Sequence, residues 1–121
     1  MIKEKTDFAK KAILLVFVIV LLCGCGNEKK EKLTLKTIVE RGNYTIVDVR
    51  TAEEYEEGHI AGALNLPYDE IDGNVELEKD KTIIVYCRSG ARSKIAYESL
   101  KKLGYEVFDA GAYDNIDLEK E

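Results

Sequence analysis

From residue 33 to the C-terminus, apolar positions follow two alternating patterns: short β-branched runs and longer segments with helical spacing. Tyr44–Arg50 (YTIVDVR) and Thr82–Tyr86 (TIIVY) are rich in β-branched residues, which predicts two buried strands. Ala61–Pro67 and Tyr105–Phe108 predict shorter extended segments. Strands that alternate with helices predict an α/β fold with a mainly parallel central sheet and helices on both of its faces.

Helices are predicted between these strands. Leu33–Arg41 and Ala91–Leu103 carry apolar residues at helical spacing, and each is followed by a glycine that ends the helix. A third, short helix is predicted from Thr51 as its N-cap, with Glu54 three residues later and Gly58 at its end. Two further segments are expected to form a single helical turn and a last short helix: Tyr68–Ile71 and Tyr113–Leu118.

The N-terminal residues show a different pattern. A lysine-rich start, Met1–Lys11, precedes Ala12–Leu22 (AILLVFVIVLL), which contains no polar residue. A helix of this apolar length rises only ~16 Å, about half of the ~30 Å hydrocarbon core of a bilayer. The layout therefore predicts a secretory signal peptide, with an uncleaved signal anchor as the alternative.

The LCGC sequence of Leu22–Cys25 resembles the cleavage box of bacterial lipoproteins. The resemblance implies that residues 1–24 are removed and that Cys25 carries the lipid. Residues 25–32 would then form a charged tether, and residues 33–121 the globular domain. The expected location is the extracytoplasmic face of a cell membrane, reached through the lipid anchor.

Charge and cysteine content narrow the possible functions. Removal of residues 1–24, with four lysines and two acidic residues, would change the net charge from −5 to −7. An acidic domain gives no reason to expect a nucleic acid partner. After processing, Cys87 would be the only thiol, because Cys23 leaves with the signal and Cys25 carries lipid. With His59 as the single histidine, neither a disulfide, a metal site nor a cofactor is expected.

The segment YCRSGARS places Cys87 at the end of the strongest predicted strand. Gly90 allows a tight turn before the next helix, and successive backbone N–H groups in such a loop can form an anion-binding concavity. Arg88 and Arg92 add positive charge. These features favour a thiolate, and hence a nucleophilic cysteine. The alternative is a buried core cysteine beside two surface arginines.

Two motifs resemble the rhodanese (sulfurtransferase) domain family: DVRTAEEYEEGHIAGALNLP at Asp48–Pro67 and VYCRSGARS at Val85–Ser93. The resemblance extends over Leu33–Leu118 and departs from the family at DAGAYDNI, where members often carry a Gly-Gly pair and a tryptophan. It implies that Cys87 attacks the outer sulfur of a donor such as thiosulfate and carries that sulfur as a persulfide. Cyanide or a thiol would then accept the sulfur. The residues expected to bind the anionic donor and the persulfide form the loop: Arg88, Ser89, Gly90, Ala91, Arg92 and Ser93.

Four residues separate Cys87 from Arg92, whereas cysteine phosphatases have five. The shorter loop favours a single sulfur atom over a phosphate group. A persulfide relay that passes sulfur to a protein partner, with little turnover, is the main alternative. A phosphatase is the weaker one.

Three further residues are expected to support the site. Asp48 and Arg50 end the first predicted strand, and Arg50 is expected to pair with Asp48 or a nearby glutamate. His59 is expected to have a structural role within the GHIAGA segment. The four glutamates of the third helix are expected to form a solvated face: Glu53, Glu54, Glu56 and Glu57.

Overall fold

The computed structural model describes residues 32–121. The predicted signal peptide and the predicted lipidation site, Cys25, lie outside these residues. Within residues 32–121, no helix has both the length and the apolar character that crossing a bilayer requires.

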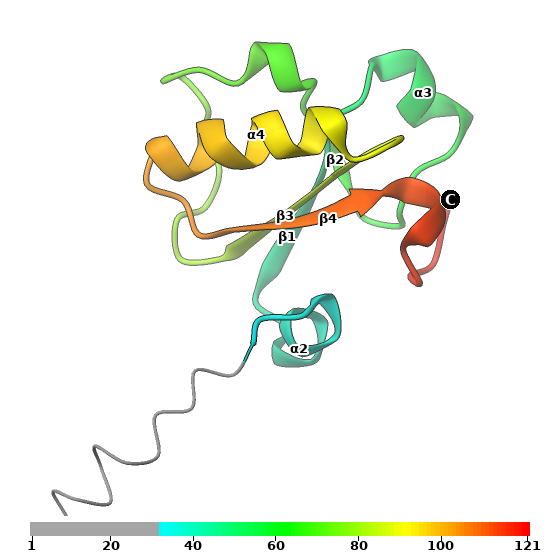
Figure 1. The fold of residues 1–121 in the computed structure, drawn as a ribbon, viewed down its shortest axis with the longest axis horizontal. Coiled ribbons are helices and arrows are strands. Elements are labelled where there is room, and N and C mark those ends of the chain that lie inside the picture. The colour runs from blue at the N-terminus through cyan, green and yellow to red at the C-terminus, as the bar shows by residue number, and fades with distance from the viewer. Residues whose placement is uncertain (1–31) are drawn as a thin grey trace, which may run out of the picture. The chain divides into compact units, whose positions relative to one another are not determined.

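A four-stranded sheet in the order β2-β1-β3-β4 forms the centre of the fold (Figure 1). All three neighbouring pairs of strands are parallel, as the alternation of strands and helices predicted. Parallel strands bring their carboxyl ends to one edge of the sheet, where functional sites of α/β proteins usually lie. The strands have these bounds: β1 Tyr44–Asp48, β2 Leu64–Asn65, β3 Thr82–Cys87 and β4 Val107–Ala112.

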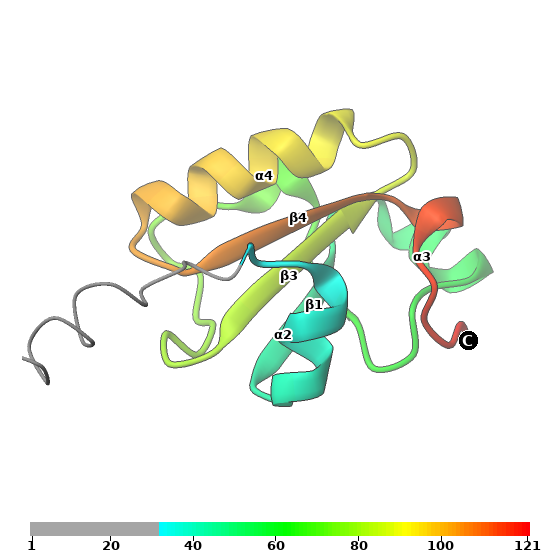
Figure 2. The same cartoon turned by 60° about the horizontal axis from the view of Figure 1, so that its bottom comes forward.

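Helices cover both faces of the sheet, as predicted. In Figure 2, α4 (Ala91–Lys102) lies on one face and α2 (Leu35–Arg41) on the opposite face. The remaining helix, α3 (Ala52–Glu57), begins with the predicted capping box, in which the Thr51 hydroxyl and the Glu54 carboxylate each bind the other's backbone N–H. Two single 3₁₀ turns complete the fold: η1 (Tyr68–Glu70) and η2 (Tyr113–Asn115).

Side chains of the central strands alternate between two separate hydrophobic cores. On β3, Ile83 and Val85 point to the α4 side, while Ile84 and Tyr86 point to the α2 side. Because both faces are covered, both sets are buried, which explains why the strand is an unbroken apolar run in the sequence. The second core also includes residues near the C-terminus, among them Ile116.

Two predictions for the C-terminal segment differ from the structure. The last strand begins at Val107 rather than Tyr105 and runs to Ala112. Its register shifts by one residue opposite Val85 and Tyr86 of β3, so the ladder continues through the AGA segment. The predicted last helix is a single 3₁₀ turn. Ile95, an apolar position of α4, remains 49% exposed.

Candidate functional site

Cys87 is the last residue of β3 and is fully buried. It lies opposite Ala112 of β4, at the carboxyl edge of the parallel sheet. The chain then turns through residues 88–90 into α4. Gly90 makes this turn in the left-handed region, with φ of 98°, and its backbone N–H donates a 3.0 Å hydrogen bond to Cys87 Sγ. The sulfur therefore lies beneath a loop whose amide points at it.

The environment of Cys87 favours the thiolate. Burial is the strongest single influence and acts to raise the pKa of the thiol. Hydrogen bonds from Ser93 and from the backbone N–H groups of Gly90 and Ser89 outweigh burial together, so the pKa lies below its ordinary value. The direction agrees with the sequence expectation. The loop N–H groups, which were expected to act together with the arginines, are among the main groups that lower the pKa.

Ser93 connects the loop to the thiol from the first turn of α4. Its side chain is fully buried, and its hydroxyl donates a 3.0 Å hydrogen bond to the Gly90 carbonyl oxygen. The hydroxyl also lies within hydrogen-bonding reach of Cys87. Its single proton can serve only one of these acceptors at a time, so a charged sulfur would compete with the carbonyl oxygen for it.

Arg92 is held by Glu54 from α3. The two guanidinium nitrogens donate hydrogen bonds of 2.7 and 3.0 Å to the two carboxylate oxygens. The side chains are 26% and 19% exposed. The prediction that all four glutamates of α3 form a solvated face is therefore wrong for Glu54. The Glu54 carboxylate instead compensates the positive charge of Arg92.

Arg88 is exposed, and within residues 32–121 no ion pair includes it. Its side chain borders a polar hollow of about 230 Å³ beside the loop. Basic, acidic and tyrosine side chains share this lining with Gly58: Arg50, Glu54, Glu57, Arg88, Tyr113 and Asp114.

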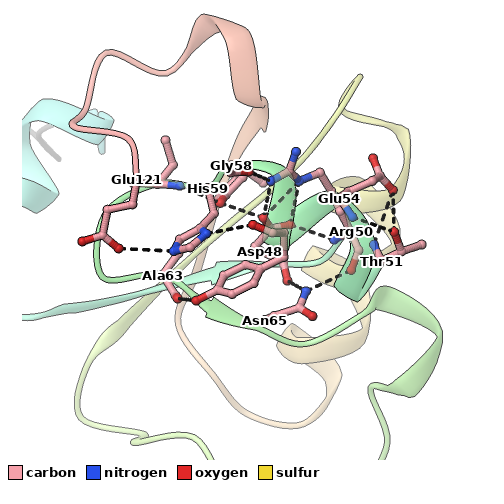
Figure 3. A network of polar contacts seen from close by, with 12 residues as sticks. Asp48, Arg50, Thr51, Glu54, Gly58, His59, Ala63, Asn65 and Glu121 are labelled. Atoms are coloured by element: carbon pink, nitrogen blue, oxygen red, sulfur yellow. Dashed lines mark hydrogen bonds and ion pairs between the residues drawn. The ribbon is translucent and has the colours of Figure 1, made fainter.

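Asp48 and Arg50, which borders this hollow, form a buried ion pair, as predicted for Arg50 (Figure 3). The Arg50 guanidinium donates to both Asp48 carboxylate oxygens, at 2.6 to 3.0 Å, and also to the Gly58 carbonyl oxygen at 2.6 Å. The Asp48 and Arg50 side chains are 0% and 7% exposed. Because Asp48 compensates the positive charge of Arg50, the pair adds no net charge to the hollow.

Tyr86 belongs to the same network, although it was not among the predicted site residues. Its hydroxyl donates 2.8 Å to Asp48 Oδ2 and accepts 3.0 Å from the Ile60 backbone N–H. The apolar run around it gave no sign of a polar role. Strand alternation would have placed it on the face opposite Cys87, which is where it lies.

His59 makes contacts away from the thiol. Its Nδ1 donates to the Tyr55 carbonyl oxygen at 2.8 Å, and its ring stacks on the Tyr55 ring with centroids 3.8 Å apart. Its Nε2 lies 3.3 Å from the Glu121 carboxylate. Backbone hydrogen bonds between His59 and Glu121 join the same segments (Figure 3). These contacts fit the structural role expected for this residue.

The family model described as "Rhodanese-like domain" matches residues 31–114. The thiosulfate sulfurtransferase PspE of Escherichia coli is 36% identical over 78 residues, which cover 61% of this chain and 75% of PspE. The putative sulfur carrier protein YrkF of Bacillus subtilis is 40% identical over 62 residues, which cover 50% of this chain but only 34% of YrkF.

Solved structures show the same fold. The structure described as rhodanese with anions from Escherichia coli has 34% sequence identity and a TM-score of 0.59. The matched region covers 64% of this chain and 96% of that one.

Proposed function

This chain belongs to the rhodanese-like domain family, and from that premise we propose that it moves sulfane sulfur from a small anionic donor to a thiophilic acceptor through a persulfide on Cys87. The observation that carries the proposal is the buried Cys87 sulfur, which accepts a 3.0 Å hydrogen bond from the Gly90 N–H at the carboxyl end of β3. The donors around this thiol lower its pKa, and a thiolate is the form that attacks sulfur.

In the first half-reaction, the Cys87 thiolate attacks the outer sulfur of thiosulfate. A new S–S bond forms, the S–S bond of the donor breaks, and sulfite leaves with the electron pair. The cysteine then carries a persulfide whose terminal sulfur is anionic. The backbone N–H groups of residues 88–93 are the donors that would hold it, each with about 1.5–3 kcal/mol of interaction with the charged atom.

In the second half-reaction, the acceptor attacks the terminal sulfur of the persulfide. The S–S bond breaks, and the Cys87 thiolate leaves with the electron pair. Cyanide would become thiocyanate, and a thiolate acceptor would become a persulfide. The same donors that stabilised the attacking thiolate stabilise it as a leaving group.

A persulfide relay is the second candidate. It uses the same Cys87 chemistry, but a protein thiol takes the sulfur and thiosulfate turnover is slow. The similarity to YrkF, described as a putative sulfur carrier protein, supports this candidate. The loop length continues to disfavour a phosphatase, because only four residues separate Cys87 from Arg92.

Mass spectrometry of the purified protein after incubation with thiosulfate tests the proposal. Cys87 is expected to gain the mass of one sulfur atom, and Cys87→Ser is expected to stay unchanged while retaining its fold by circular dichroism. A Cys87 that stays unmodified with both thiosulfate and a monoanionic thiosulfonate would contradict the proposal. Steady-state thiocyanate formation with cyanide then separates the enzyme from the relay, since a relay would load sulfur but turn over negligibly.

We also propose that the domain is tethered by a lipid on Cys25 at the extracytoplasmic face of a cell membrane. The LCGC sequence and the apolar run before it support this proposal. Metabolic labelling with a radioactive fatty acid checks it. The wild-type chain is expected to take up label and sediment with membranes, and Cys25→Ala to lose the label.

A further inference from the structure

Within residues 32–121, Glu54 is the only acidic side chain that forms an ion pair with residues 88–90, the loop after Cys87, or with the first turn of α4. Both of its carboxylate oxygens accept hydrogen bonds from Arg92, and one of them also accepts from the Thr51 hydroxyl at 3.2 Å. The capping box thus fixes the carboxylate in the position that meets the guanidinium.

The pair compensates the positive charge of Arg92, which lies close enough to Cys87 to interact with it electrostatically. Glu54 raises the pKa of Arg92, chiefly through its hydrogen bond, so both partners stay charged and compensate each other. Arg50 is compensated in the same way by Asp48. Arg88 is then the single cation in the lining of the hollow without an ion-pair partner among the described residues.

Two acidic side chains of the same lining form no ion pair within residues 32–121, and their charges repel anions. Glu57 and Asp114 border the hollow together with Arg88. A dianion such as thiosulfate that enters this hollow therefore meets one cation and two carboxylates that have no ion-pair partner among the described residues. A donor with a single negative charge pays half of that repulsion and can still contact Arg88.

We propose that Glu54 determines the charge class of sulfur donor that this site accepts, by neutralising Arg92 and so favouring monoanionic donors over dianionic ones. The inference rests on the proposed function, and names its substrate class. The charged groups that interact with Arg92 come from three parts of the chain: Glu54 from α3, Arg50 from the segment after β1, and Cys87 from β3. Arg88 adds its charge from the loop.

Substitution of Glu54 by glutamine isolates this charge. Glutamine keeps an oxygen that can accept hydrogen bonds from Arg92 and Thr51, but it leaves the arginine charge uncompensated. The electrostatic attraction between Arg92 and a donor scales with the charge of the donor. When Arg92 is left uncompensated, the rate at which a dianion loads Cys87 is therefore expected to rise about ten times more than the rate for a monoanion.

The experiment compares the second-order rates at which two donors load sulfur onto Cys87, followed by mass spectrometry. Thiosulfate is the dianion, and benzenethiosulfonate is the monoanion. Each transfers its outer sulfur to the thiolate, releasing sulfite or benzenesulfinate with the electron pair. The ratio of the thiosulfate rate to the thiosulfonate rate is expected to rise about tenfold in Glu54→Gln.

Three variants serve as controls. Glu53→Gln, an exposed neighbour on the same helix with the same change in charge, is expected to leave the ratio within about twofold of wild type. Arg92→Gln leaves Glu54 uncompensated and is expected to lower the ratio about tenfold. The double variant of Glu54 and Arg92 removes both charges and is expected to return the ratio to that of wild type.

An unchanged ratio in Glu54→Gln would overturn the inference, and so would an equal rise in Glu53→Gln. Should Glu54→Gln lose its circular dichroism signal, the fall expected in Arg92→Gln decides the question. Failure of both donors to load wild-type Cys87 would instead refute the proposed function. In that case, alkylation of Cys87 tests the role of Glu54. The ratio of the rate with anionic iodoacetate to the rate with neutral iodoacetamide is expected to rise about tenfold in Glu54→Gln. A constant ratio would overturn the role of Glu54.

Discussion

The Tyr86 hydroxyl donates a 2.8 Å hydrogen bond to Asp48 Oδ2, and the two residues face each other in the register of β3 and β1. The same hydroxyl accepts from the Ile60 N–H. This contact joins the ends of two strands to the segment after α3. Tyr86 precedes Cys87 directly, so the contact also fixes the strand end from which the sulfur extends.

Replacement of Tyr86 by phenylalanine is expected to lower the free energy of unfolding by about 1–3 kcal/mol. The change leaves the buried Ile60 N–H without its acceptor and takes one donor from the Asp48 carboxylate. Urea unfolding measures the loss. Tyr97→Phe is the control, because its hydroxyl meets only Lys101 at the surface, and we expect a change within about 0.5 kcal/mol. Equal losses in the two variants would contradict the role of the buried hydroxyl.

Replacement of Gly90 by alanine is expected to cost about 1–2 kcal/mol in the free energy of unfolding, because φ of 98° is unfavourable for a residue with a Cβ. Space is not the reason, since the nearest atom to an added Cβ would be Gly111 Cα at 3.8 Å. The measurement is thermal and urea unfolding. Gly73→Ala is the matched control: its φ lies outside the left-handed region and its Cβ would meet open space, so no loss is expected. An unchanged free energy of unfolding in Gly90→Ala would contradict the requirement for glycine at this position.

Replacement of Ser93 by alanine is expected to raise the pKa of Cys87, because it removes one of the donors that offset burial of the thiol. The sign follows from the charge: fewer donors to the thiolate favour the protonated form, so ionisation moves to higher pH. Ultraviolet thiolate absorbance, corrected with Cys87→Ser, gives the titration. Ser99→Ala, on the same helix but away from the loop, is expected to leave it in place. A Cys87 titration that Ser93→Ala does not move would assign the low pKa to the amides alone.

Acid is expected to remove the stabilising contribution of Glu54. Arg92 lowers the pKa of this carboxyl from 4.5 to about 2, with smaller contributions from Thr51. A depressed pKa means that the contribution is complete above the unfolded value of 4.5 and is lost as pH falls through about 2. The stability difference between wild type and Glu54→Gln should therefore shrink over this range in urea unfolding. In an Arg92→Gln background the pH dependence should be much weaker, and its persistence would assign the shift to another partner.

The sequence by itself determined the order and type of the main elements. Thr82–Tyr86 carries no charge and has an apolar centre, Ile83–Val85, because parallel strands here are buried on both faces, so the run predicted β3 correctly. Thr51, Glu54 and Gly58 predicted α3 because capping is a contact between residues three or four apart. The position of Cys87 was predictable for the same reason, since a strand, a glycine and a helix start next to one another in the sequence specify a loop.

Only the tertiary structure decided which charges meet. Glu54 and Arg92 are 38 residues apart, as are Asp48 and Tyr86, and each pair forms because the parallel sheet brings those elements to one edge. Periodicity and capping act over one or two turns of chain, so they locate a glutamate on α3 without naming its partner. The pairing decides whether Arg92 attracts an anion or is already compensated, and that depends on how the elements pack in space.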